Sequence, residues 1–238
     1  MKFEKNLIEG VLMQRYKRFF ADVKLNDGSI VTAHCANSGS MLSVKESGAR
    51  VWLTPVDDPK RKLKFTWELI EIGNGLVGIN TGHPNRLVAD AISAGQIAEL
   101  TGYASLKREQ KYGKNSRIDI LLEDSAKPPC YVEIKNVTMK RKLGPEYPAE
   151  FPDSVTERGT KHLHELADMV AAGARSVMFY LVQRTDSTHF KIATDIDPNY
   201  GKALEKALKS GVEAICYGCD VTPNGITIAK PLTMDLPR

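Results

Sequence analysis

The sequence contains no long apolar run. In 238 residues, no stretch approaches the roughly 18 apolar residues that a membrane-spanning helix requires. The first residues, Met1–Lys5, also lack the apolar core of a secretory signal peptide. These absences exclude a transmembrane helix from the prediction. We therefore expect a cytoplasmic protein without a membrane partner.

Cysteine is scarce, with four residues in the chain. Cys216 and Cys219 have the spacing of half a zinc site, but no second cysteine pair and no His-x(3–5)-His pattern follows them. The pair lies in an alternating strand pattern, where a cysteine is an ordinary small apolar residue. We therefore expect a structural role for this pair, in a reducing compartment.

Neither sign of charge dominates the chain. The formal net charge is +4, with 26% charged and 42% hydrophobic residues. This composition is typical of a soluble globular protein with a substantial core, and the length suggests two domains. A mildly positive charge permits a polyanionic partner without requiring one.

The first third of the chain is predicted to form a small β-barrel. Residues 7 to 80 alternate short apolar segments with turns such as Asn26-Asp27-Gly28 and Gly73-Asn74-Gly75. Five or six short strands in about 75 residues favour an OB-like barrel. The predicted strands are Leu7–Met13, Phe19–Leu25, Ile30–His34, Val51–Pro55, Phe65–Ile72 and Leu76–Ile79.

Two clusters of basic and aromatic residues, 15–20 and 60–67, lie in this part of the chain. A nucleic-acid surface needs cations for the phosphates and flat rings for base stacking, and both clusters provide them. The alternative is that strand alternation buries Phe65 and Trp67 and leaves the lysines in solvent; for Trp67 we favour the core. The candidate DNA contacts here are Arg15, Tyr16, Lys17, Arg18, Lys62 and Lys64.

A domain boundary is predicted at Asn80–Asn85, a run of turn-forming residues. The hydrophobic period changes there from two residues to 3.6, which indicates a helix that Asn85 could cap. We therefore expect a barrel domain at 1–83 and a second domain at 84–238.

The second domain is predicted to have a mixed α/β fold. Ser154–Glu157 has the sequence of a capping box that opens a second helix, and Gly173 ends that helix. Ser176–Val182 is nearly all apolar, as in a central strand covered on both faces. Asp197-Pro198 caps a third helix. The predicted order from residue 85 is helix, three strands, helix, strand, helix and two strands.

Two of these strands carry acidic residues that we expect to lie together. Side chains alternate along a strand, so Glu133 and Lys135 project from the same face. If the strand Ser116–Leu122 pairs with Cys130–Val137 through the polar turn between them, Asp119 can lie beside Glu133. The patch would then hold two carboxylates and one ammonium group.

Two adjacent carboxylates repel unless a cation or a proton lies between them, and Mg²⁺ or Mn²⁺ with oxygen ligands suits the pair. Lys135 would face the metal-bound water or the scissile phosphate, as metal-assisted phosphodiester hydrolysis requires. The alternative is the solvated face of an edge hairpin with a Glu-Lys pair, and the spacing alone does not decide between the two.

The second helix carries further candidate DNA contacts. Arg158, Lys161 and His162 share one face at i, i+3 and i+4, where they could touch a phosphate backbone. The alternative is an ordinary charged helix surface. Arg117, beside Asp119, is the last candidate contact.

The order of elements, with Asp on the second strand and Glu-x-Lys on the third, resembles the core of the PD-(D/E)XK nuclease superfamily. The resemblance implies that Asp119 and Glu133 bind a divalent metal and that Lys135 assists the attacking water. Many members carry a further carboxylate on the first helix. This implies Glu99, if the helix extends that far, with Glu109 as second choice.

Seven motifs spread along the chain carry a more specific resemblance. They are Gln14–Phe19, Asn37-Ser38-Gly39-x-Met41, Asn80-Thr81, Lys111-Tyr112-Gly113, Ser116–Asp119, Glu133–Thr138 and Phe151–Leu163. With them the chain resembles the sugar fermentation stimulation protein family from end to end. The resemblance implies an OB-like N-terminal part, a nuclease-like C-terminal part, DNA as partner, and a link to regulation of sugar, notably maltose, metabolism.

Two classes of function stay open. In the first, the protein is a Mg-dependent or Mn-dependent nuclease that hydrolyses DNA. In the second, it is a non-catalytic DNA-binding regulator on a nuclease scaffold; an RNA-directed barrel is a weaker third idea. Binding to DNA should depend little on base sequence, because no base-reading helix motif is present. A homodimer is compatible with the sequence.

Overall fold

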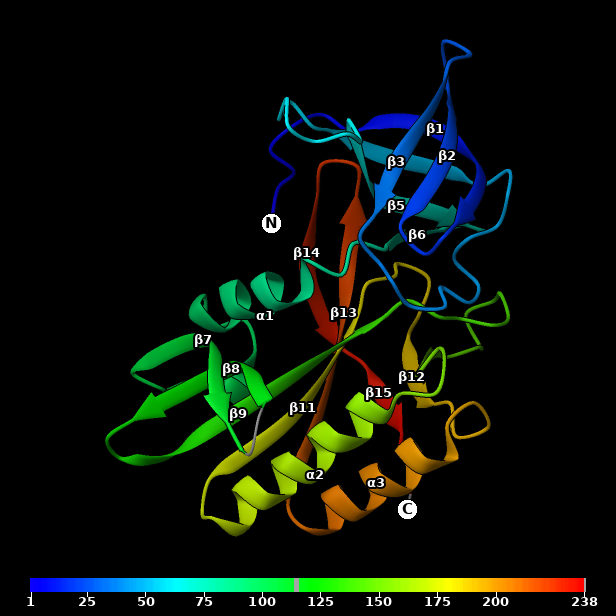
Figure 1. Cartoon of the computed structure of the whole chain (residues 1–238). Helices are drawn as coiled ribbons and strands as arrows, with labels where there is room; N and C mark the ends of the chain where they lie inside the picture. Colours follow the sequence, from blue (N-terminus) through cyan, green and yellow to red (C-terminus); the bar gives the residue numbers. More distant parts are fainter. Residues whose placement is uncertain (114–115, 238) are drawn as a thin grey trace.

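The computed structural model describes residues 1–113 and 116–237, and its N-terminal part is a β-barrel (Figure 1). Six strands follow the order β3-β2-β1-β4-β5-β6, and an additional pairing between β3 and β5 closes the barrel. The strands are β1 (Ile8–Tyr16), β2 (Phe20–Leu25), β3 (Ile30–Cys35), β4 (Arg50–Pro55), β5 (Phe65–Ile72) and β6 (Gly75–Gly78).

The inward-facing residues of these strands form the core of the barrel. Leu12, Val23 and Leu53 are fully buried, as alternation along the strands requires. Trp67 is also fully buried, and its indole nitrogen donates a hydrogen bond to the carbonyl oxygen of Leu69 at 2.8 Å. The prediction that Trp67 belongs to the core is therefore confirmed.

The C-terminal part contains a second sheet of six strands, in the order β14-β13-β11-β9-β8-β7. β11 pairs in parallel with both β9 and β13, and the other neighbours are antiparallel. The strands are β7 (Ser105–Tyr112), β8 (Ser116–Asp124), β9 (Lys127–Val137), β11 (Arg175–Val182), β13 (Glu213–Thr222) and β14 (Gly225–Pro231). The predicted mixed α/β core is thus confirmed.

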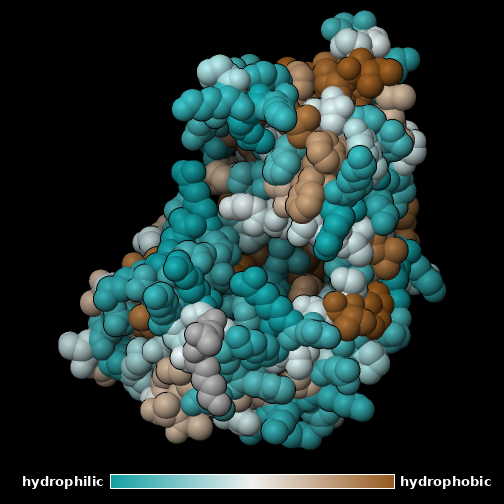
Figure 2. Space-filling model, in the orientation of Figure 1, coloured by the Kyte–Doolittle hydropathy of each residue, from teal (hydrophilic) through white to brown (hydrophobic). Residues whose placement is uncertain are grey.

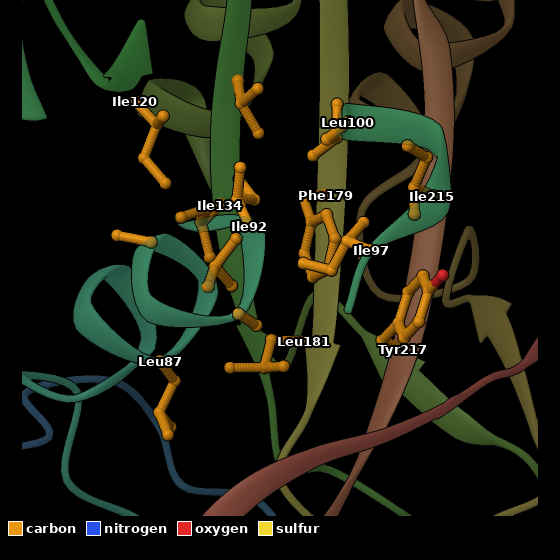
Figure 3. Packing of buried hydrophobic residues seen from close by; sticks show 14 of the residues in the cluster. Leu87, Ile92, Ile97, Leu100, Ile120, Ile134, Phe179, Leu181, Ile215 and Tyr217 are labelled. Carbon is orange, nitrogen blue, oxygen red and sulfur yellow. The ribbon is translucent and has the colours of Figure 1, made fainter. Parts of the chain in front are cut away.

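Helices cover this sheet on both faces (Figure 1). α1 (Pro84–Ser93) packs on one face, where Leu87 and Ile92 lie among the strand residues Ile134 and Leu181 (Figure 3). α2 (Glu157–Ala171) and α3 (Pro198–Lys209) cover the other face and contact each other. None of the helices in the described parts of the chain is long and apolar enough to cross a membrane.

Two of the three helix starts differ from the predicted ones. α1 begins at Pro84 with His83 as its N-cap, so Asn85 lies inside the first turn and is free to point its side chain elsewhere. In α2 the capping side chain is that of Thr156, which accepts from the backbone N–H of Gly159, and not that of Ser154. Asp197 caps α3 as predicted.

Four short elements were not predicted. A 3₁₀ turn, Ala98–Leu100, follows α1, and β10 (Ala149–Phe151), β12 (His189–Ile192) and β15 (Thr233–Asp235) form a small parallel sheet. Strands of three or four residues are too short to carry a periodic signal. The four cysteines are buried; Cys216 packs into the core beneath α2 and Cys219 into the core beneath α1, while their purely structural role stays a prediction.

Candidate functional site

The predicted pair Asp119 and Glu133 lies where β8 and β9 stop pairing. The last pair of the ladder is Ile120 with Val132. One residue further along β8, the side chain of Asp119 replaces the backbone as the acceptor for β9. Its Oδ2 accepts a hydrogen bond from the backbone N–H of Ile134 at 2.7 Å. The predicted arrangement of the two carboxylates on neighbouring strands is therefore present.

The alternation of side chains is also broken at Asp119. Ile118 packs into the core beneath α2, whereas Ile120, two residues on, packs into the core beneath α1. In a regular strand these two residues would lie on the same face. The irregularity leaves the Asp119 carboxylate at the edge between the two cores, half-buried.

The environment of Asp119 resists ionisation. Burial, and then the negative charge of Glu133, raise the pKa of Asp119 from 3.8 to about 6. The hydrogen bond from Ile134, the charge of Lys135 and a hydrogen bond from Asn85 act in the opposite direction. A positive charge beside Asp119 would relieve this cost.

Glu133 is 3% exposed and its two oxygens differ. Oε1 accepts from Lys135 Nζ at 2.8 Å and is in contact with His162 Nδ1. Burial raises the pKa of Glu133, but the hydrogen bonds and charges of His162 and Lys135 outweigh it, so the pKa lies below its ordinary value. Oε2 is buried and has no hydrogen-bond partner among the described residues. A buried acceptor of this kind is costly unless a ligand satisfies it.

The side chain of Asn85, predicted to cap a helix, instead contacts two acidic side chains. Its side-chain amide donates to Asp119 Oδ1 at 2.7 Å and to Glu109 Oε1 at 3.0 Å. Glu109 lies on β7 and adopts a left-handed backbone conformation, with φ of 54°. The amide therefore joins two carboxylates from adjacent strands.

Glu99, the first choice for a third carboxylate, lies elsewhere. α1 ends at Ser93, and Gly95, with φ of 69°, prevents the helix from continuing. Glu99 follows in the 3₁₀ turn, where its Oε2 accepts from the hydroxyl of Tyr217 on β13 at 2.8 Å. The expected helix extension is wrong, and Glu99 is not part of the Asp119 and Glu133 cluster.

His162 does not share the exposed face of its neighbours. It is 4% exposed and points at the sheet, where Nδ1 contacts Glu133 and lies 3.5 Å from Lys135 Nζ. Arg158 and Lys161 are exposed, as predicted. His162 therefore cannot act as a surface contact to phosphate, and it instead holds Glu133 in place.

A further buried carboxylate, Glu165, was missed. It lies one turn after His162 on α2 and is 6% exposed, with Lys161 Nζ 3.6 Å from its Oε1. Burial, and then the charges of Glu133, Glu165 and Asp119, raise the pKa of the Tyr112 hydroxyl above its ordinary value. The i, i+3 spacing from His162 was the available signal, because both residues then face the same neighbour.

The acidic side chains of the described residues do not form a complete, preformed metal site. Within residues 1–113 and 116–237, no three His, Cys, Asp or Glu side chains meet closely enough to hold a metal ion. Glu133 Oε2, which has no hydrogen-bond partner within these ranges, and the raised pKa of Asp119 nevertheless fit a hard cation. Mg²⁺ in proteins is commonly held by one or two carboxylates, with waters and substrate phosphates completing the shell.

The first basic cluster of the barrel, residues 15–20, contains one arginine that stabilises the fold and two basic residues that are exposed. Arg15 is committed to the fold: it donates to the carbonyl oxygens of Arg18, Asn37 and Gly39 at 3.0, 2.9 and 2.9 Å. Lys17 and Arg18 are exposed in the turn between β1 and β2, both with positive φ, although Arg18 Nε also donates to a carbonyl at 3.0 Å.

An aromatic pair flanks this turn, and further basic residues are exposed elsewhere on the molecule. Tyr16 stacks on Phe20, with ring centroids 5.5 Å apart and planes at 18°. Lys62 and Lys64 are exposed in the loop before β5. Arg117, on β8, is exposed as well. Figure 2 shows a hollow, bordered by hydrophilic residues, between the barrel and the part of the molecule that carries α2.

These features define a class of protein: an OB-like barrel joined to a mixed α/β core. Two family models match the chain, an SfsA N-terminal OB domain at residues 13–79 and a sugar fermentation stimulation protein RE domain at residues 82–225. The chain belongs to the sugar fermentation stimulation protein family, as the sequence resemblance predicted. The division at residues 83 and 84 stays a prediction.

Relatives and solved structures agree with this assignment. Sugar fermentation stimulation protein homologues of Paramagnetospirillum magneticum and Rhodospirillum rubrum are 57% and 56% identical, covering 99% and 100% of this chain and 98% and 100% of theirs. The structure of Pyrococcus furiosus SfsA in complex with Ca²⁺ matches with a TM-score of 0.87 and 25% identity, over 99% of this chain and 98% of that one. A repair endonuclease from Pyrococcus abyssi, with a TM-score of 0.33 and 12% identity, is too distant to support an argument about function.

Proposed function

We propose that this protein is a cytoplasmic DNA-binding protein that hydrolyses phosphodiester bonds at a divalent-metal site formed by Asp119 and Glu133. One observation carries the proposal: among the residues that the structure describes, Glu133 Oε2 is buried without a hydrogen-bond partner, beside an aspartate whose pKa is raised to about 6. Two such carboxylates have a physical reason to share a cation. The relative from Pyrococcus furiosus is described in complex with Ca²⁺, which supports a divalent ion here.

Asp119 and Glu133 Oε2 would hold the cation, for which we propose Mg²⁺ or Mn²⁺. Such an ion acts as a Lewis acid and lowers the pKa of bound water. His162 and Lys135 both bind Glu133 Oε1, so they leave Oε2 free for the ion. The Lys135 ammonium also supplies a positive charge where negative charge develops on a reacting phosphate.

The exposed basic residues would position the DNA backbone. Phosphate contacts orient a nucleic acid without reading its sequence. We expect binding to be largely independent of sequence and to weaken steeply with salt. The proposed contacts are Lys17, Arg18, Lys62, Lys64, Arg117, Arg158 and Lys161, with Tyr16 available for base stacking.

Two observations favour a second function. Lys135 already forms an ion pair with Glu133, at 2.8 Å, and no third acidic ligand completes the cluster among the described residues. This would suit a DNA-binding regulator of sugar metabolism whose carboxylates bind a cation only for stability. Such a protein would bind DNA but leave it intact.

The test is to incubate pure protein with single-stranded, duplex and branched DNA, with Mg²⁺, Mn²⁺ or EDTA. We expect products with a divalent ion and none with EDTA. Lys135→Ala should abolish cleavage, whereas Lys111→Ala, an exposed lysine on β7, should not. DNA that is bound but uncut under all conditions would favour the regulator.

A further inference from the structure

The outer face of the barrel strands β1, β2 and β3 carries three rings in one row (Figure 1). Tyr16 lies opposite Phe20, and Phe20 lies opposite His34, so the three side chains project from the same face of neighbouring strands. The rings of Tyr16 and Phe20 are stacked, with centroids 5.5 Å apart and planes at 18°. All three residues are half-buried and none belongs to the barrel core. The row therefore lies at the surface.

A row of polar side chains lies beside the rings, two residues further along each strand. Gln14 lies opposite Asp22, and Asp22 lies opposite Thr32. The Asp22 carboxylate accepts from the Gln14 amide at 2.9 Å and from the Thr32 hydroxyl at 2.8 Å. It also accepts from the Tyr16 hydroxyl at 3.2 Å. This bond ties the ring of Tyr16 to the sheet and fixes the direction in which it points.

The outward face of β5 differs, because the segment that leads into α1 covers it. Thr66, which lies opposite His34, is 9% exposed, and Glu68, two residues further on, is 4% exposed. Glu68 accepts from the Asn80 amide at 2.9 Å and lies 2.7 Å from His83 Nε2. The row of rings ends where this cover begins, so the face of β1, β2 and β3 is left open.

The two basic clusters of the barrel lie at opposite ends of the row. The exposed pair Lys17-Arg18 directly follows Tyr16. At the other end, His34 lies opposite Thr66, which comes two residues after the exposed Lys64. Three neighbouring strands span roughly 10 Å from the first to the third. A nucleic-acid strand that crosses the rings would therefore meet exposed cations on both sides.

The row has the chemistry of a surface for bases and not of a phosphate site. Burial, and then the positive charge of Arg61, lower the pKa of His34 below its ordinary value. At neutral pH the three rings are therefore uncharged. Uncharged flat rings stack on any base, whereas phosphates require cations. Bases in a duplex are covered by their neighbours on both faces, so only unpaired bases can stack on such a row.

We propose that the row of three rings binds the unpaired bases of a DNA strand, while the exposed cations at its two ends contact the phosphates. The preferred DNA then contains a single-stranded segment, and stacking holds it with little regard to base sequence. The inference rests on the DNA-binding part of the proposed function and is independent of the metal site.

Fluorescence anisotropy of labelled nucleic acids with the full-length protein in EDTA tests this, because no strand is cut under these conditions. The DNA probes are a thymine strand, an abasic strand of the same length and charge, and a duplex of that length. Wild type should bind the thymine strand at least about fivefold more tightly than the abasic strand, since only the first offers bases for stacking.

Phe20→Leu keeps an apolar side chain and removes the ring. It should weaken binding of the thymine strand by about fivefold or more. Binding of the abasic strand and of the duplex should change by less than about twofold, because phosphate contacts dominate there. The matched control is Tyr147→Leu, which removes a half-buried ring of the α/β part that lies 5.3 Å from Lys142 Nζ. It should leave all three affinities unchanged.

Phe20→Trp separates lost stacking from misfolding, because it keeps a ring in the row. It should bind the thymine strand at least as tightly as wild type, and stacked bases should quench the fluorescence of the added indole. Equal wild-type affinity for the thymine and abasic strands, wild-type affinity in Phe20→Leu, or an unquenched indole would overturn the assignment and leave DNA binding through phosphates intact. A uridine RNA strand that binds more tightly than the thymine strand would overturn the choice of DNA. Absence of binding to all three DNA probes would overturn the proposed DNA binding and this inference with it.

Discussion

Replacing Asp119 by asparagine separates the free-energy cost of a buried charge at this position from its proposed role in binding a metal ion. Burial and the charge of Glu133 raise its pKa from 3.8 to about 6, so keeping it ionised near neutral pH costs the metal-free protein about 3 kcal/mol. Asparagine removes this cost. It offers a single acceptor oxygen to the two donors, Asn85 and Ile134, and loses about 1 kcal/mol in return. The metal-free variant should therefore be about 2 kcal/mol more stable than wild type.

With a divalent ion bound, wild type should become more stable than Asp119→Asn. At a free concentration of about 100 times its Kd, an ion that binds only the folded state adds roughly 2.7 kcal/mol. For a chain of this length, that corresponds to a rise of roughly 5 to 10 °C in melting temperature. Asp119→Asn loses one of the two proposed ligands and should show no rise.

The assay is thermal unfolding of both proteins in EDTA and in Mg²⁺ or Mn²⁺. Asp90→Asn serves as control, because it removes an exposed carboxylate from α1 whose partner, Arg86, lies 3.6 Å away. The control should keep the full response to metal. Equal responses in wild type and Asp119→Asn would refute the reasoning, since the ion would then bind elsewhere.

Three further outcomes follow from the same contacts. Because the pKa of Asp119 is raised in the folded state, the folded protein holds this proton more tightly than the unfolded chain does. As the pH rises from about 4 to about 6, the free energy of unfolding in EDTA should therefore fall by about 3 kcal/mol relative to that of Asp119→Asn. If urea unfolding gave the two proteins the same pH dependence of stability, this prediction would be contradicted. Lys135→Ala should keep the metal-induced rise in melting temperature and lose only cleavage, so a lost rise would make the lysine part of the metal site. Replacing Lys17 and Arg18 together by alanine should weaken binding to all DNA sequences alike and reduce the salt slope by about two, whereas Arg15→Ala should chiefly lower the melting temperature; unchanged DNA affinity in the double variant would make the turn a plain solvent-exposed surface.

The elements that the sequence predicts well are those with a strong local period. The barrel strands and the central strand β11 alternate or run apolar over several residues, and Asp197-Pro198 is a strong helix start. Asp119 and Glu133 could be brought together because the period of two and the short turn between β8 and β9 leave few registers.

Residues whose roles depend on long-range packing were less predictable. The i, i+4 spacing puts Arg158 and His162 on one side of a helix, but only the packing of α2 on the sheet decides that His162 is inside. Asn85 looked like a cap because its role depends on β7 and β8, which follow later in the chain. The end of α1 at Ser93 removed Glu99 from the site, and Gly95 was the local signal for that end.

The location of the cation is the most direct test of the account. Crystals of the protein grown or soaked with Mn²⁺ and measured near the manganese absorption edge would give an anomalous peak at the bound ion. We predict a peak within coordination distance of Asp119 and of Glu133 Oε2. A peak at other side chains, or no peak at an ion concentration that raises the melting temperature, would contradict the proposed site.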